Sequence, residues 1–120
     1  GLGVDSIKIK NYNLMNVLFV CSRNLWRSPT AEEIYKNHSD IQVRSAGTES
    51  SARIKLSAKT INRADLIFVM EKKHKEKINA NFPLESENKR IIILEIYDDY
   101  KFMDPELIDE IRSKAEPYFV

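Results

Sequence analysis

The residue types with the greatest chemical potential stand close together near the start of the chain, where the only cysteine, Cys21, is followed six residues later by Arg27. A cysteine thiolate is a strong nucleophile, and an arginine guanidinium can bind two oxygens of a phosphate group at once. The apolar run Val17–Val20 precedes the cysteine and favours a strand that is buried on both faces. Ser28 can cap a helix that begins with Pro29, so the residues between are predicted to form a strand-to-helix loop.

A loop that leads into the first turn of a helix is suited to anion binding. Its backbone N–H groups and the positive end of the helix dipole favour negative charge, both on the thiolate of Cys21 and on a bound phosphate group. Such a thiolate can attack phosphorus and form a cysteinyl-phosphate, while Arg27 stabilises the equatorial oxygens. The alternative is that Cys21 is a small buried residue at the end of a strand. That alternative does not account for the polar loop and the helix start that accompany the cysteine.

The segment Val17–Glu32 resembles the signature of the low molecular weight protein tyrosine phosphatases. Further matches follow in the same order, at Val43–Thr48, at Ala64–Met70 and in an acidic segment near the C-terminus. The resemblance implies a flavodoxin-like fold and the hydrolysis of phosphate monoesters through a phosphocysteine, with no metal ion or other cofactor. It also implies that the loop binds inorganic phosphate or a similar oxyanion.

Carried over by position, the resemblance implies a role for each residue of the loop. Cys21 is the nucleophile and Arg27 the phosphate clamp. Asn24 holds the loop conformation by bonding to Ser45, and Ser28 forms a hydrogen bond with the thiolate. The remaining loop residues, which are expected to support phosphate binding, are Ser22, Arg23, Leu25 and Trp26.

Four features depart from the family pattern. Arg23 stands where a small residue is common, and Trp26 stands where many members carry a second cysteine. The segment between Thr48 and Ala64 is shortened, and the pair at 98–99 is Asp-Asp where the family has Asp-Pro. These differences predict a bulkier and more basic loop rim with a shorter active-site wall, and they indicate a short bacterial-type branch of the family.

A general acid is needed to protonate the leaving group, and three aspartates follow the last apolar strand. Asp104 precedes a proline and is expected to cap the final helix. The resemblance aligns Asp98 with the family's acid, and Asp99 and Asp104 are kept as alternatives. It also places Tyr100 and Phe102 at the rim, where they would flank an aromatic ring.

Strands and helices alternate along the chain, which predicts an α/β fold. The expected elements are strands at Val17–Val20, Ile41–Arg44, Leu66–Val69 and Ile91–Leu94, helices at Pro29–Asn37, Lys72–Asn81 and Pro105–Glu116, a helical turn at Leu56–Arg63 and a loop at Ser45–Ile54. Such a pattern indicates three layers, in which helices cover both faces of a central four-stranded parallel sheet. The carboxyl ends of parallel strands carry the active site in folds of this kind, and the Cys21 loop, Ser45, Met70 and the loop at 95–104 all fall there.

The bulk properties favour one compact enzyme. The chain has 120 residues, and its net charge of +1 gives no reason to expect binding to nucleic acid. The basic cluster Lys72–Lys77 is interpreted as the solvated face of a helix, with His74 on that face and no metal role. A lone cysteine excludes an internal disulfide and is typical of the reducing cytoplasm. No segment has the apolar length of a membrane span. Residues 1–14 are interpreted as an extension or a cloning remnant before a domain at 15–120, with an edge strand around Ile7–Lys10 as the alternative.

Three functions are compatible with these observations. The favoured function is a tyrosine phosphatase that acts on a phosphotyrosine protein or a small aryl phosphate. The first alternative is a phosphate-binding module with little turnover. The second is an arsenate reductase, which would depend on an external thiol because Cys21 is the only cysteine in the chain.

Overall fold

A computed structural model describes residues 14–119 of the protein. The predicted edge strand at residues 7–10 and nearly all of the predicted extension at residues 1–14 lie outside the described residues. Within the described part, no helix is long and apolar enough to cross a membrane.

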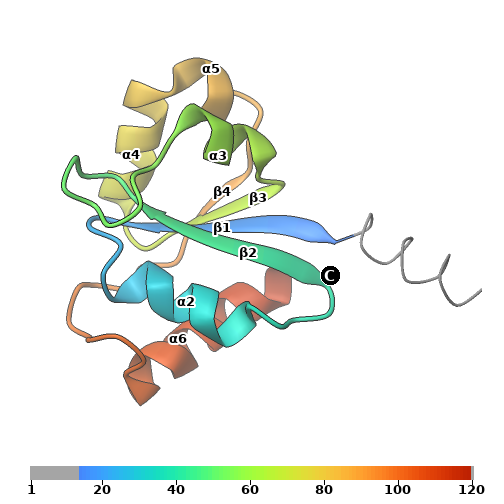
Figure 1. The fold of residues 1–120 in the computed structure, drawn as a ribbon, viewed down its shortest axis with the longest axis vertical. Helices are drawn as coiled ribbons and strands as arrows, with labels where there is room; N and C mark the ends of the chain where they lie inside the picture. The colour runs from blue at the N-terminus through green and yellow to red at the C-terminus, as the bar shows by residue number, and fades with distance from the viewer. Residues whose placement is uncertain (1–13, 120) are drawn as a thin grey trace, which may run out of the picture.

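Four parallel strands form one central sheet in the order β2-β1-β3-β4, which confirms the predicted sheet (Figure 1). The strands are β1 (Met15–Cys21), β2 (Ile41–Gly47), β3 (Leu66–Val69) and β4 (Ile91–Ile93). Strand β2 extends three residues beyond its predicted end, because its backbone stays paired with β1 as far as the partners Cys21 and Gly47. The predicted loop therefore begins after Gly47, and Ser45 lies within a strand.

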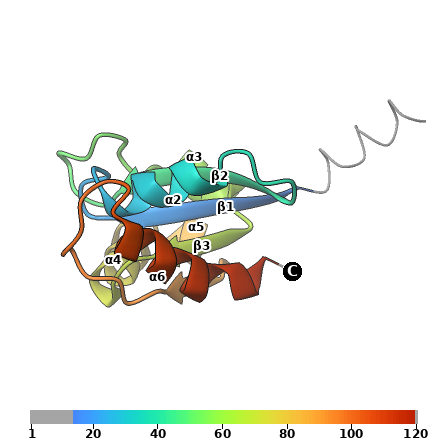
Figure 2. The same ribbon diagram turned by 90° about the horizontal axis from the view of Figure 1, so that it is seen from below.

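Helices cover both faces of the sheet, as predicted. On one face lie α2 (Arg27–Tyr35) and α6 (Pro105–Ala115), which is followed by a short 3-10 turn, Glu116–Tyr118. On the other face lie α3 (Ala58–Arg63), α4 (Lys72–Asn81) and the short α5 (Pro83–Ser86), which the sequence pattern did not indicate (Figures 1 and 2). The bounds of α4 match the prediction, since the helix stops before the Phe82–Pro83 pair.

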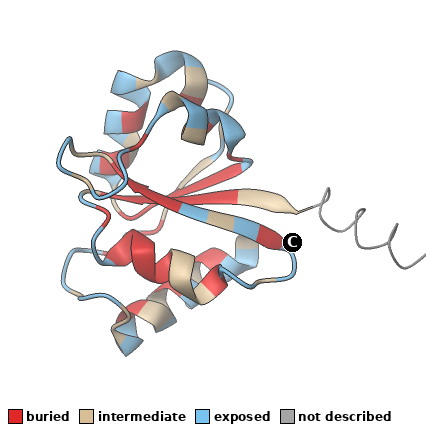
Figure 3. Ribbon diagram, viewed as in Figure 1, coloured by how far each residue is buried: buried red, intermediate tan, exposed pale blue. Residues whose placement is uncertain are grey.

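Strand β1 is the centre of the hydrophobic core, as its buried colouring in Figure 3 shows. Its alternate residues point to opposite faces, so that Phe19 joins the cluster under α2 and α6 while Leu18 and Val20 join the cluster on the α3 and α4 side. The ring of Phe19 stacks on that of Phe68, with centroids 5.0 Å apart. Because both faces of β1 are fully packed, the strand is a rigid support for Cys21 at its end.

Candidate active site

Strand β1 ends at Cys21, which is only 3% exposed. Its Sγ lies 2.9 Å from Ser28 Oγ. The predicted N-cap role of Ser28 is therefore wrong: helix α2 begins earlier, at Arg27, and its cap residue is Trp26. The Trp26 carbonyl accepts the first hydrogen bond of the helix from Thr30 N, at 3.1 Å, which leaves the Ser28 hydroxyl free to turn toward the thiol. A hydroxyl at this distance can donate to a thiolate.

The backbone of the loop is held by the segment at 48–53. The carbonyls of Cys21, Ser22 and Arg23 accept hydrogen bonds from N–H groups of that segment, at 2.9, 2.9 and 3.0 Å. In a trans peptide the C=O and the following N–H point in opposite directions. The N–H groups of Ser22, Arg23 and Asn24 therefore point away from this segment. This geometry leaves a row of donors available to an anion.

Gly47 allows the end of β2 to pass close beneath the loop. A Cβ atom at this position would lie 2.6 Å from the Ser22 carbonyl oxygen and 2.6 Å from the Ala52 Cβ. A residue with a side chain would push the loop and the 48–53 segment apart. The shortened segment after Thr48 thus packs closely against the loop and holds it through backbone hydrogen bonds.

Asn24 holds the middle of the loop. It is fully buried, and its φ of 57° lies in the left-handed region, which Asn tolerates better than most residues. Its Nδ2 donates to Ser28 Oγ at 2.8 Å and to Ser45 Oγ at 2.9 Å, and Ser45 in turn donates to Glu32 Oε1 at 2.7 Å. The Asn24–Ser45 contact is the one that the family resemblance implies. The supporting role of Glu32 was not anticipated from the sequence.

Arg27 is 2% exposed and is fixed by groups from two other segments. One terminal nitrogen donates to Glu71 Oε2 at 2.6 Å and to the Ile96 carbonyl at 2.9 Å, while Nε lies 3.6 Å from Asp98 Oδ1. Burial by itself raises the pKa of Glu71, but the hydrogen bond and charge of Arg27, helped by the charge of Lys73, outweigh it and lower that pKa. Glu71 is therefore the ionised partner that holds the guanidinium in place. Its position just after a buried strand, at the carboxyl edge of the sheet, was the signal that could have identified it.

His74 corrects the interpretation of residues 72–77 as a solvated face, because its side chain is fully buried. Its Nδ1 accepts a hydrogen bond from Glu71 N at 3.0 Å, and its Nε2 lies 2.8 Å from Ser22 Oγ. Burial, together with the nearby charge of Arg27, lowers the pKa of His74 from 6.5 to about 4. The imidazole is thus neutral at neutral pH and belongs to the site.

A small hollow opens over the loop, and it is lined by Cys21, Ser22, Arg23, Leu25, Trp26, Arg27 and Asp98. Of the three candidate acids, only Asp98 lines it, and its side chain is 56% exposed. Asp99 is exposed, whereas Asp104 caps α6 by accepting from Glu106 N at 2.9 Å, which confirms the predicted cap. Tyr100, predicted to stand at the rim, packs partly buried against the core and does not line the hollow. Among residues 14–119, no cluster of three His, Cys, Asp or Glu side chains is placed to hold a metal ion.

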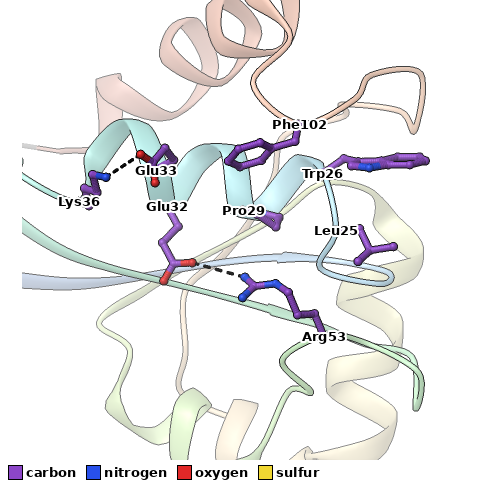
Figure 4. Close-up of a pocket in the computed structure, with 8 residues that line it drawn as sticks. All are labelled: Leu25, Trp26, Pro29, Glu32, Glu33, Lys36, Arg53 and Phe102. Carbon is purple, nitrogen blue, oxygen red and sulfur yellow. Dashed lines mark hydrogen bonds and ion pairs between the residues drawn. The ribbon is translucent and has the colours of Figure 1, made fainter.

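Leu25 and Trp26 also line a second, larger and more open groove of about 620 Å³, which is shown in Figure 4. Its other lining residues are Pro29, Glu32, Glu33, Lys36, Arg53 and Phe102. Leu25, Trp26 and Phe102 are 40%, 40% and 49% exposed, which places three large apolar side chains at one surface. Phe102 thus lines this neighbouring groove and does not line the hollow over Cys21.

The charged side chains of the groove pair with one another. Lys36 Nζ lies 2.6 Å from Glu33 Oε1, and Arg53 lies 3.8 Å from Glu32 Oε1 (Figure 4). Because these charged groups already pair with one another, the apolar side chains of the groove are the groups available to contact a ligand. Exposed apolar side chains that gather at a hollow surface are typical of binding sites.

Comparison with solved structures identifies the fold. No protein-family model matches the sequence, and no curated protein sequence matches it closely. The tyrosine phosphatase Wzb from Escherichia coli K30, solved in complex with phosphate, is 19% identical and has a TM-score of 0.70 over 88% of this chain and 96% of that one. A low molecular weight phosphotyrosine phosphatase from Vibrio cholerae is 23% identical, with a TM-score of 0.63 over 87% and 94% of the two chains. The YwlE arginine phosphatase from Geobacillus stearothermophilus is 21% identical, with a TM-score of 0.60 over 87% and 94%.

These matches cover nearly the whole length of both chains in each case. The protein therefore has the α/β fold of the low molecular weight phosphatases, which confirms the fold that the resemblance implied. Identities of this size establish the fold alone, so the activity has to be argued from the side chains of the site.

Proposed function

We propose that the protein is a cysteine-dependent phosphatase that hydrolyses aryl phosphates such as phosphotyrosine. One observation carries the proposal: the thiol of Cys21 and the immobilised guanidinium of Arg27 enclose a loop whose backbone N–H groups face away from its own hydrogen-bonded carbonyls. A tetrahedral dianion satisfies both the donors and the positive charge. A buried arginine held by Glu71 and by the Ile96 carbonyl is preorganised for such a ligand, since little reorganisation is needed on binding.

The proposed reaction has two steps. In the first, the Cys21 thiolate attacks phosphorus, an S–P bond forms, and the bond from phosphorus to the aryl oxygen breaks while Asp98 gives its proton to that oxygen. In the second, water attacks phosphorus, its proton passes to the Asp98 carboxylate, and the S–P bond breaks to release phosphate and the thiolate. Arg27 and the loop N–H groups stabilise the equatorial oxygens in both steps.

The groove beside the hollow favours a polypeptide as the phosphate carrier. Leu25 and Trp26 line both spaces, so a chain that leaves the hollow crosses them into the groove. From Trp26 to Lys36 the helix rises about 15 Å at ~1.5 Å per residue, which is the length of about four to five extended residues at ~3.3 Å each. A segment with an apolar side chain next to its phosphotyrosine would cover Trp26 and Phe102. A small aryl phosphate would leave them exposed.

Two alternatives remain distinct from this proposal. A phosphate-binding module with little turnover is favoured by the contact between Asp98 Oδ1 and Arg27 Nε at 3.6 Å, because this contact directs the carboxyl group to the arginine and away from a leaving group. An arsenate reductase would need an external thiol, since Cys21 is the only cysteine. The predicted cytoplasmic location stays a prediction.

The deciding experiment measures hydrolysis of para-nitrophenyl phosphate by the wild-type protein and by Cys21→Ser. We expect turnover in the wild type and a loss of several orders of magnitude in the variant, while the variant still binds inorganic phosphate. Tight phosphate binding without turnover in the wild type would support the binding module instead. Parallel assays with phosphotyrosine and phosphoarginine peptides define the leaving group. Arsenate reduction that depends on added thiol, in the absence of phosphatase turnover, would support the reductase.

A further inference from the structure

His74 is a buried titratable group that the proposed reaction does not use. It lies in the first turn of α4, on the face of the sheet opposite α2, and reaches the loop through Ser22. We propose that His74 is a positioning residue that aims the Ser22 hydroxyl at the phosphate held in the Cys21 loop. This inference rests on the proposed function and adds a side-chain donor to the backbone donors and to Arg27.

The hydrogen bonds define where the protons lie. Nδ1 of His74 accepts from Glu71 N at 3.0 Å, so in the neutral imidazole the single proton is on Nε2. Nε2 therefore donates to Ser22 Oγ across 2.8 Å. The serine oxygen acts as the acceptor in this contact, and its own hydrogen is directed to another group. Ser22 lines the hollow together with Cys21 and Arg27, which makes a phosphate oxygen in that hollow its acceptor.

The charges around the imidazole keep this proton arrangement in place. Arg27, Lys73 and Lys77 all disfavour a second proton on His74, and burial acts in the same sense, while only Glu71 acts against them. The imidazole pKa of about 4 means that Nδ1 remains an acceptor at neutral pH. If the proton were on Nδ1 instead, two N–H donors, those of His74 Nδ1 and Glu71 N, would face each other.

Glu71 supports both phosphate-directed groups. Its carboxylate holds Arg27 at 2.6 Å, and its backbone N–H holds His74 at 3.0 Å. Glu71, at the start of α4, thus fixes a donor at each end of the loop. Its side chain fixes Arg27 directly, and its backbone N–H fixes His74, which contacts Ser22. Removing an oxyanion donor from a site of this kind typically costs ~10²–10³ in kcat. Since the loop offers several other donors, we expect a loss of about tenfold to a hundredfold for Ser22.

Three variants separate the donor function from the structural one. Ser22→Ala removes the hydroxyl. His74→Asn keeps an oxygen near the place of Nδ1 to accept from Glu71 N but has no group that reaches Ser22. His74→Gln places an amide nitrogen near the place of Nε2 and so keeps the donor to Ser22.

We expect His74→Asn to lower kcat toward para-nitrophenyl phosphate by about the same factor as Ser22→Ala, and His74→Gln to recover most of it. The double variant Ser22→Ala/His74→Asn should be no slower than either single variant, because His74 acts through Ser22. Thermal unfolding of each variant shows whether the losses follow stability.

The matched control is His38→Asn. His38 Nδ1 accepts from Asp40 N at 3.0 Å, which is the same type of backbone contact, but it lies at the amino end of β2. Its replacement should leave kcat unchanged. Two results would overturn the inference: additive losses in the double variant, or a His74→Gln protein as slow as His74→Asn at equal thermal stability.

The outcome is distinguishable from failure of the proposed function. If the wild type shows no turnover, the phosphatase proposal fails by itself. The same variants are then compared in the Cys21→Ser background for their affinity for inorganic phosphate. There, equal weakening by Ser22→Ala and His74→Asn with recovery by His74→Gln supports the inference, and unchanged affinities overturn it.

Discussion

The two ends of the sheet differ in how far their polar groups are buried. At the carboxyl end, Asn24, Arg27, Ser45 and His74 are all buried and joined through hydrogen bonds to one another or to neighbouring loops. At the amino end the polar contacts lie at the surface, as between Asn16 N and the Asp65 carboxylate at 2.8 Å. Lys89 likewise donates from the surface to backbone carbonyls of residues 62 and 64, both at 2.7 Å. The polar side chains at the carboxyl end have thus lost their contact with water, whereas those at the amino end keep much of it.

This difference supports the proposal that the carboxyl end of the sheet is the binding end. Burying polar groups costs free energy unless each is paired, and at the carboxyl end Asn24 Oδ1 is buried without a partner. A site that needs only stability would replace such a network with apolar side chains. The network is understandable if its task is to hold a guanidinium and a row of N–H groups ready for an anion. Variants at the two ends should therefore separate activity from stability.

Among the variants that compare the two ends of the sheet, the largest effect is expected for Arg27→Lys. A lysine keeps the positive charge but has neither the planar fork that binds two phosphate oxygens nor the reach to contact Glu71 and the Ile96 carbonyl together. We expect kcat/KM for para-nitrophenyl phosphate to fall by about 10³-fold or more. Steady-state kinetics provide the measurement, with circular dichroism to verify the fold.

The matched change at the amino end is Lys89→Ala, which removes a cation that also holds two backbone carbonyls. We expect it to lower the free energy of unfolding by about 1 kcal/mol and to leave kcat/KM within twofold. A comparable loss of activity in both variants would contradict the division of roles between the two ends of the sheet.

The next effect is expected for Asp98→Asn. An asparagine cannot give a proton to the leaving oxygen, so turnover of phosphotyrosine peptides should fall by about 10²-fold. Para-nitrophenolate leaves without much help from an acid, and its release should fall far less. The ratio of kcat for the two substrates is the measurement.

Asp99→Asn and Asp104→Asn are the controls for this assignment. Asp104 accepts from Glu106 N at 2.9 Å as the cap of α6, and Asn is also a good cap, so that variant should be close to wild type in both stability and turnover. If Asp99→Asn shows the dependence on leaving group and Asp98→Asn does not, the acid is the neighbouring residue.

A smaller effect is expected in the groove. Phe102→Ala removes one apolar wall, and we expect kcat/KM for a phosphotyrosine peptide to fall several-fold relative to kcat/KM for para-nitrophenyl phosphate. Because Trp26 is the only tryptophan, its fluorescence reports binding at the groove directly. Leu84→Ala, at an apolar side chain that is 81% exposed on α5, is the control. An unchanged ratio in Phe102→Ala would exclude peptide binding in this groove.

Much of the fold could be predicted from the chain because buried parallel strands appear as continuous apolar runs. Three of the four strands have close to their predicted limits, and the bounds of α4 and the cap at Asp104 were confirmed. The end of β2 was missed because Ser45–Gly47 pairs with β1 through its backbone, which side-chain pattern does not report. The start of α2 was missed because Ser28 is recruited by the thiol and no longer acts as a cap.

The side chains around the loop were harder to predict, because their partners come from distant segments. Glu71 is 44 residues from Arg27, and His74 is 52 residues from Ser22. For His74, the surrounding lysines drew attention away from the spacing that indicates its burial. His74 and Ile78 are four residues apart and are the two buried residues of α4, so they form its inward face. Reading that spacing would have moved the histidine from solvent to the core.

The smallest expected effect concerns the pH dependence of stability that the buried His74 imidazole contributes. The pKa of His74 is lowered from 6.5 to about 4 by burial and by Arg27, so between these values the unfolded chain binds a proton that the folded protein does not. Stability from this group is fully present above pH 6.5 and is lost as the pH falls toward 4. The lowered pKa of Glu71 acts in the same direction at still more acidic pH. In thermal unfolding from pH 7 to 4.5, we expect His74→Asn to lose fewer degrees than the wild type. Equal slopes in the variant and the wild type would show that the buried imidazole does not set the acid limit of the fold.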